Sequence, residues 1–154
     1  MELKQLIDLF EKNFLEYARL IRKIGENNSR ESSIQSLSKL KIHIRELANL
    51  EEEIVELRLK KILKEEHPYL PTIDVQTIQN NSSYQNQPFL EICNHFLKQK
   101  KEVLKMLYSL PAENWNRTGV HEREGHIAFK EFIRRMTEKD KQILGDFKSS
   151  LESH

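Results

Sequence analysis

The sequence lacks the features that would place it outside a reducing compartment or in a membrane. Cys93 is its single cysteine, so no disulfide can form within the chain. No apolar run reaches the roughly 20 residues that a helix needs to cross a bilayer. A basic-then-apolar leader is also missing from its first residues. These absences predict a cytoplasmic protein without a membrane segment.

Residues that break regular structure are scarce as well, with four glycines and four prolines among 154 residues. Hydrophobic residues make up 38% and charged residues 32% of the chain, a balance that favours long amphipathic helices over a turn-rich sheet fold. A chain of this length buries about 70% of its unfolded surface when it folds. We therefore expect one domain spanning residues 1–154 that needs no metal to fold.

Net charge is almost absent, because 25 Lys and Arg residues stand against 24 Asp and Glu residues. Without an excess of positive charge, no general electrostatic attraction draws the chain to nucleic acid or to anionic lipid. The charge balance predicts that neither a nucleic acid nor a membrane is a partner.

What the sequence does contain is apolar spacing of three and four residues, the spacing of one helical face. It predicts four helices, over residues 2–24, about 33–66, 88–110 and about 124–151. Gly25 is expected to end the first helix, and Ser32 with Gln35 has the spacing of a capping box before the second. Pro68 ends the second helix, and Pro88 fits the first turn of the third.

The polar segment 68–87 is predicted to be a surface linker between the second and third helices. Its twenty residues reach about 66 Å when extended, which exceeds the roughly 45 Å of a thirty-residue helix. The two helices it joins can therefore be parallel. The fold class predicted is all-α, a four-helix bundle with a long crossover between helices 2 and 3.

Polar residues interrupt the apolar face at two places. In the last helix Lys139 and Asp140 occupy inward positions where leucine would be expected, and in the second helix His43 and Glu46 form a matching interruption. A buried charge without a partner is costly. We therefore predict that Glu46 and Lys139 form an ion pair in the interior.

Four short motifs resemble the DinB-like family. Residues 115–121, Trp-Asn-Arg-Thr-Gly-Val-His, are similar to the segment before the family's last helix. Residues 139–143 keep the Asp of the family's His-Asp-x-x-His motif but neither histidine, and residues 46–51 begin with Glu where the family has its third histidine. Lys100, followed by leucines at 104, 107 and 110, resembles the family's Arg-x-x-x-Leu-x-x-Leu pattern.

The resemblance implies a four-helix bundle with a crossing second connection, often a homodimer, that frequently binds a divalent transition metal through three histidines. Some members resemble transferases or isomerases that use low-molecular-weight thiols. In this chain the three ligand positions hold Glu46, Lys139 and Ile143. An ammonium repels a cation and an alkyl side chain donates nothing, so the metal site is predicted to be lost and no cofactor is expected.

Two further groupings of side chains remain open on the sequence. A relocated metal site would use His43 and Glu46 together with His121 or His126. A ligand pocket would be lined by five residues, one of which is Trp115. The alternative for Trp115 is a structural plug that closes the helix ends. The candidate pocket residues are His43, Trp115, Arg117, His121 and Asp140.

The function expected from these observations is that of a DinB-like, non-catalytic module that binds a small molecule or a protein, most simply as a homodimer. The alternative is a metal-dependent thiol transferase or hydrolase with relocated ligands. A third interpretation is a purely structural dimerisation module, which would present a large apolar helix face.

Overall fold

The computed structural model of the chain describes residues 2–26, 34–80 and 87–152. Over these ranges the chain is mostly helical, which confirms the all-α class, and it carries a small three-stranded sheet that we did not predict. The elements are α1 (Leu3–Glu26), α2 (Ile34–Ile54), η2 (Val55–Leu59), α3 (Lys60–Lys64), β1 (Tyr69–Leu70), α4 (Val75–Asn80), α5 (Phe89–Ser109), η3 (Ala112–Asn116), β2 (Thr118–His121), β3 (Gly125–Ala128) and α6 (Phe129–Glu152).

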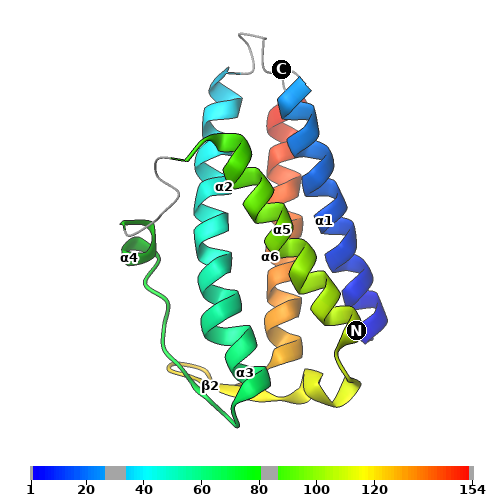
Figure 1. The fold of residues 1–154 in the computed structure, drawn as a ribbon, viewed down its shortest axis with the longest axis vertical. Helices are drawn as coiled ribbons and strands as arrows, with labels where there is room; N and C mark the ends of the chain where they lie inside the picture. Colours follow the sequence, from blue (N-terminus) through cyan, green and yellow to red (C-terminus); the bar gives the residue numbers. More distant parts are fainter. Residues whose placement is uncertain (1, 27–33, 81–86, 153–154) are drawn as a thin grey trace.

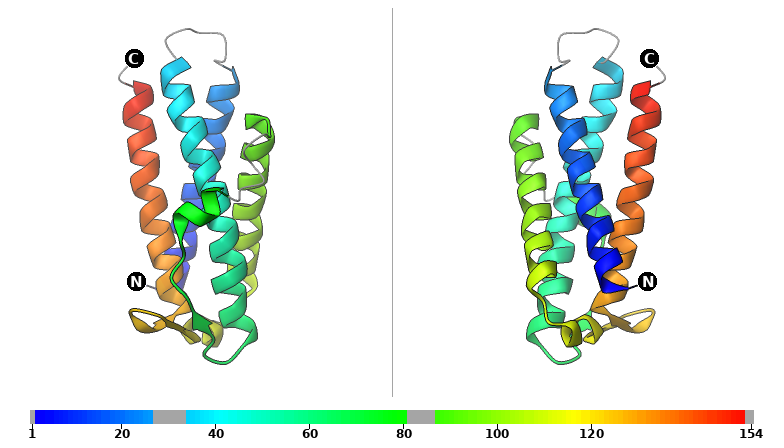
Figure 2. Two further views of the ribbon diagram at one scale, coloured as in Figure 1. Left: turned by 90° about the vertical axis from the view of Figure 1, so that its left-hand side faces the viewer. Right: turned by 90° about the vertical axis from the view of Figure 1, so that its right-hand side faces the viewer.

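The four long helices α1, α2, α5 and α6 of the described ranges lie side by side, and the sheet closes one end (Figures 1 and 2). We call these four helices the helical body. Helix α1 packs against α5 and α6, and α2 packs against α5. Each helix thereby buries the apolar face that its spacing predicted. Of the helices described, none is both long enough and apolar enough to cross a membrane.

Helix α2 continues without a break through η2 and α3, from residue 34 to residue 64. This matches the predicted second helix closely, although Ser32 of the predicted capping box lies outside the described residues. Residues 55–59 form a π-helical turn within this path, a feature that often marks functional regions. His67 follows the helix with a left-handed backbone, at a φ of 46°.

Two boundaries of the other helices agree closely with the sequence, and one differs. Helix α1 ends at Glu26, one residue beyond Gly25, and α5 begins directly after Pro88. The predicted linker contains β1 and α4, and α4 packs against α2. The last helix was predicted from about Glu124 but begins at Phe129, because residues 125–128 form a strand.

The sheet has the order β1-β2-β3. Strand β1 is parallel to β2, and β2 is antiparallel to β3. Strand β1 pairs with β2 through Tyr69 opposite Val120, and β2 pairs with β3 from Thr118 opposite Ala128 to the turn. Gly125 has a φ of 77°, which favours glycine, and this turn directs the chain into a hairpin instead of a helix.

Gly119 lets the sheet approach the second helix closely. A Cβ atom at this position would lie 2.5 Å from Leu70 Cδ1 and 3.1 Å from Ile62 Cγ1. Both distances are shorter than ordinary contacts, so a larger residue would require Leu70 and Ile62 to shift.

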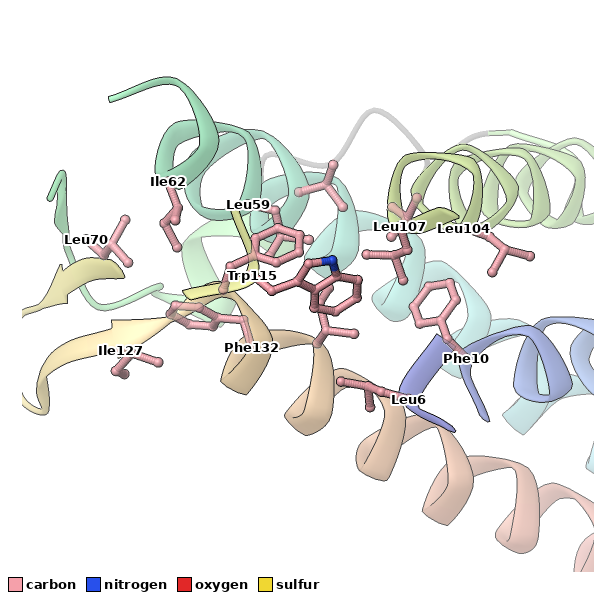
Figure 3. Packing of buried hydrophobic residues seen from close by; sticks show 14 residues of the cluster. Leu6, Phe10, Leu59, Ile62, Leu70, Leu104, Leu107, Trp115, Ile127 and Phe132 are labelled. Atoms are coloured by element: carbon pink, nitrogen blue, oxygen red, sulfur yellow. The ribbon is translucent and has the colours of Figure 1, made fainter. Parts of the chain in front are cut away.

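Buried side chains form two hydrophobic clusters along the helical body. The sheet-end cluster surrounds Trp115 (Figure 3) and contains Leu6, Phe10, Val55, Leu59, Ile62, Leu70, Val103, Leu104, Leu107, Trp115, Ile127, Phe129, Phe132 and Ile133. The far cluster contains Tyr17, Leu20, Ile21, Ile44, Leu47, Ala48, Ile92, Cys93, Phe96, Leu144 and Phe147. Cys93 is fully buried in it.

Candidate functional site: a buried ionic cluster

Helix α5 carries a lysine on its buried face. Lys100 lies four residues after Phe96 and four before Leu104, so all three project from the same side of the helix. Its side chain is only 2% exposed. Lysine is almost never fully buried without a partner, so this position demands opposite charge nearby.

The opposite charge comes from two other helices. Lys100 Nζ forms ion pairs with Glu51 Oε1 from α2 and with Asp140 Oδ2 from α6, and both carboxylates are buried. Tyr17 of α1 donates its hydroxyl hydrogen to Asp140 Oδ1 over 2.9 Å. Each of the four long helices therefore supplies one residue, and we call Tyr17, Glu51, Lys100 and Asp140 the ionic cluster.

Aromatic rings enclose the ammonium group. Lys100 Nζ lies 5.1 Å from the ring centre of Phe10, and 5.8 Å from the ring centres of both Tyr17 and Phe96. A cation within about 6 Å of a ring centre is attracted to the ring quadrupole, and more strongly where water is excluded. The rings thus stabilise the charge while they seal it from solvent.

The ionic cluster lies at the boundary between the two hydrophobic clusters. Along α5, Lys100 falls between Phe96 of the far cluster and Val103 of the sheet-end cluster. Along α6, Asp140 falls between Ile133 of the sheet-end cluster and Leu144 of the far cluster. The interior is therefore apolar on both sides of one charged layer.

The cluster holds two carboxylates against one ammonium, which is one negative charge in excess when both acids are ionised. Burial, with a further contribution from the Asp140 carboxylate, raises the pKa of Glu51 to about 7 against the opposing effect of Lys100. Burial by itself lowers the pKa of Lys100, but the two carboxylates outweigh it and the net pKa is raised. Burial and then Asp140 raise the pKa of the Tyr17 hydroxyl.

Glu51 also carries an incompletely bonded oxygen. Its Oε1 meets Lys100, but no group among the described residues hydrogen-bonds its buried Oε2. An unsatisfied buried carboxylate oxygen costs free energy, and protonation reduces that cost because it removes the charge. The geometry and the raised pKa thus identify Glu51 as an acid of the cluster that can take up a proton near neutral pH.

The chemistry available to this arrangement is restricted. A lysine with a raised pKa stays charged, and an ammonium is not a nucleophile. Both carboxylates already bind that ammonium, and three rings cover it. The ionic cluster can hold fixed charge and one exchangeable proton inside the protein.

Of the two residues of α6 that we predicted to face inward, one does. Asp140 is 4% exposed and belongs to the ionic cluster, as the interrupted apolar face predicted. Lys139 is exposed, because it lies about 100° around the helix from Asp140, on the side that faces solvent. Glu46 is exposed too, so the prediction that Glu46 and Lys139 form a buried ion pair is wrong.

Tyr17, Glu51 and Lys100 were not predicted to be site residues. A signal existed for Glu51, which lies seven residues after the buried Ile44 and therefore on the same helical face. Lys100 lay within an apolar stripe, and we interpreted it only through a family pattern. When two neighbouring helices carry a lysine and a glutamate on their apolar faces, the two residues are expected to form an ion pair.

The three positions assigned to a lost metal site are not buried together. Glu46 and Lys139 are exposed, and Ile143 is half-buried against the far cluster. In the described part of the chain, no three His, Cys, Asp or Glu side chains are grouped so as to hold a metal ion. The relocated set also fails to converge, since the His43 ring lies 5.7 Å from that of Phe147 while His121 is in the sheet.

The proposed pocket residues are likewise distributed over the molecule. Trp115 is 1% exposed and meets the Phe129 ring edge to face at 5.5 Å, which agrees with its interpretation as a plug. Arg117 donates from Nε to the Ile62 carbonyl and from Nη2 to the Glu65 carbonyl, both over 2.8 Å. It thereby caps carbonyl groups at the end of the second helix.

His121 has a local structural role. Its Nδ1 accepts hydrogen bonds from the backbone amides of Arg123 and Glu124, over 3.1 and 3.2 Å, within the β2–β3 turn. Asp140, by contrast, belongs to the ionic cluster in the middle of the helical body.

The sequence matches no protein-family model, and no curated protein matches it significantly. The likeness to the DinB-like family therefore depends on the four short motifs in the chain itself.

Proposed function

We propose that this chain is a DinB-like, non-catalytic binding module whose interior is held together by the ammonium of Lys100 in place of a metal ion. The observation that carries the proposal is the pairing of Lys100 with both buried carboxylates. The proposal includes a four-helix bundle with a long crossover. Its support is the path of β1 and α4, which lie along α2 on the way from its sheet end toward the start of α5 (Figures 1 and 2).

A metal-dependent enzyme requires donors that converge on a cation and a coordination position that stays open to substrate. Here the acids that could serve as interior donors, Glu51 and Asp140, converge on a lysine. The surrounding rings of Phe10, Tyr17 and Phe96 leave the ammonium buried. Stabilisation of the fold is the role that this geometry supports best.

Binding is assigned to a surface depression on α1 and α5. It has a volume of about 530 Å³ and is open to solvent. Leu15 and Tyr108 are 57% and 58% exposed in it, beside charges of both signs. Such a mixed surface suits a small molecule or a protein, including a second copy of the chain. It is lined by Asp8, Glu11, Lys12, Leu15, Glu16, Arg19 and Tyr108.

The interior part of the proposal is tested by metal analysis of protein purified without chelator. We expect no metal ion whose binding depends on Asp140, so Asp140→Asn should leave the metal content of the protein unchanged. A stoichiometric metal that is lost on Asp140→Asn would contradict the proposal, because that metal would occupy the place assigned to Lys100.

The binding face is tested by measuring self-association by light scattering and small-molecule binding by NMR. Leu15→Ser and Tyr108→Ser are expected to weaken binding, whereas Leu57→Ser is the matched control because Leu57 is an exposed leucine of η2. An equal loss in all three variants would contradict the assignment of this face.

A further inference from the structure

We infer that His67 and His126, with Thr118 between them, form a binding site for a divalent transition metal ion at the sheet end of the molecule. The site lies on the surface and shares no residue with the ionic cluster. It therefore goes beyond the proposed function and does not depend on it.

The two imidazole rings converge on one point. Thr118 Oγ1 lies 2.9 Å from His67 Nδ1 and 3.2 Å from His126 Nδ1. The ring centres are 5.4 Å apart and the ring planes are nearly perpendicular, at 86°. Convergent donors are the first requirement of a metal site, and here two nitrogen atoms already face the same hydroxyl.

The hydroxyl also determines the tautomers of the two rings. It carries one hydrogen, so it donates to one Nδ1 and accepts from the Nδ1–H of the other ring. A metal ion that binds both Nδ1 atoms would replace these two hydrogen bonds, and each ring would then carry its hydrogen on Nε2.

The backbone around His67 is held in an unfavourable conformation. A φ of 46° is uncommon for any residue except glycine, and a residue before proline favours extended backbone. The turn is fixed by the bond from the Val120 amide to the Pro68 carbonyl, 2.7 Å long, and by Arg117 on the Glu65 carbonyl. Such over-determined strain occurs often at binding sites, and here it directs the ring toward Thr118.

The donor set selects the kind of metal. Neutral imidazole nitrogen favours Zn²⁺, Ni²⁺ and Cu²⁺, whereas Mg²⁺ and Ca²⁺ prefer oxygen ligands. Both His67 and His126 are exposed, so water can complete the coordination. Two nitrogen donors and a hydroxyl make an open, exchangeable site, distinct from the closed sites that hold a structural metal.

The site is tested by calorimetric titration of the full chain, first stripped with chelator, using ZnCl₂ and then NiCl₂. His67→Asn keeps a residue that tolerates the left-handed backbone, and His126→Gln removes the second imidazole from the other side. His95→Gln is the matched control, because His95 is exposed on α5. We expect one equivalent to bind wild type, a loss of at least about tenfold in each site variant, and a change below about twofold in the control.

A second measurement locates the metal. Ni²⁺ should broaden the amide NMR signals around Thr118 and leave those around Asp140 unchanged. Absence of saturable binding, equal losses in the His95 control, or broadening centred on Asp140 would each overturn the inference. The thermal melt of each variant shows whether it folds, and binding retained by either folded site variant also counts against the site. Metal at Asp140 would contradict the proposed function as well, so the two failures are distinguishable.

Discussion

The middle of the helical body and its sheet end close the same interior by different means. In the middle, Lys100 pairs with both Glu51 and Asp140, and its removal would leave two buried carboxylates without a cation. At the sheet end, Trp115 fills space, Gly119 leaves room for Leu70, and the strands are held by backbone hydrogen bonds. The first region is therefore sensitive to charge and pH, and the second to shape.

The largest effect that this comparison predicts is that of Lys100→Met. The substitution removes the ammonium and leaves two buried carboxylates without a cation, so we expect a loss of about 3–5 kcal/mol in the free energy of unfolding. Urea denaturation measures it. Lys101→Met, one residue away but exposed, should change stability by less than about 0.5 kcal/mol. Similar losses in both variants would show that the charge at position 100 is solvated.

The next effect is a pH dependence carried by Glu51. Its pKa rises from 4.5 to about 7 on folding, so between these values the folded state binds more protons than the unfolded state. Stability should therefore fall as pH rises from about 4.5 to about 7, by up to about 3 kcal/mol, and level off above that.

Glu51→Gln removes this titration, so the difference between wild type and variant isolates it. Urea denaturation at pH 5 to 8 should give a flatter profile for the variant, with its relative disadvantage shrinking as pH rises. Parallel profiles for the two proteins would mean that Glu51 does not exchange a proton in this range.

At the sheet end, Gly119→Ala tests shape without changing charge. The added methyl group would overlap Leu70, so we expect a loss of about 2 kcal/mol. Gly145→Ala is the control, because nothing lies within 4 Å of its Cβ position and alanine favours a helix by up to about 1 kcal/mol. Thermal melts of both variants should move in opposite directions. If alanine at position 119 does not lower the melting temperature, the side chains of Leu70 and Ile62 can move to make room for it.

A smaller loss is expected from Tyr17→Phe. It removes one hydrogen bond to the buried Asp140 while keeping the ring, which costs about 1 kcal/mol or somewhat more. Tyr108 bonds Glu11 at the surface, so Tyr108→Phe should have less effect. The two unfolding midpoints in urea provide the comparison, and an equal shift would place Asp140 in contact with water.

The smallest effects belong to the residues that sequence reasoning placed in the interior. Glu46→Ala and Lys139→Ala should each change the free energy of unfolding by less than about 0.5 kcal/mol, because both side chains are exposed. Urea denaturation of the single and double variants checks this. A loss near that of Lys100→Met would contradict this expectation and would indicate that Glu46 and Lys139 form a buried ion pair.

Much of the fold was predictable because apolar spacing records which face of a helix is buried. The second helix, the start of α5 after Pro88 and the inward direction of Asp140 all followed from that spacing. The strand over Gly125–Ala128 was not predicted, because its pairing partner β2 and the neighbouring β1 stabilise it through contacts that no local pattern records.

The candidate site was predictable in part. The polar interruption in α6 predicted a buried charge, Asp140. The residue that pairs with Asp140 depends on how the helices are rotated about their axes. Glu46 and Glu51 are both glutamates on the same helix, and a five-residue separation places them on different faces. The spacing from Ile44 places Glu51 on the buried face, but it does not show that this face meets Lys100.

The sequence by itself determined that this chain forms long amphipathic helices and that at least one charge, Asp140, faces inward. Only the tertiary structure decided which charges meet, since an ion pair depends on distances between separate helices. The same holds for His67 and His126, 59 positions apart in the chain, whose rings converge on Thr118. The spacing of apolar residues specifies which face of a helix is buried, and the packing of helices and strands specifies which residues meet in a site.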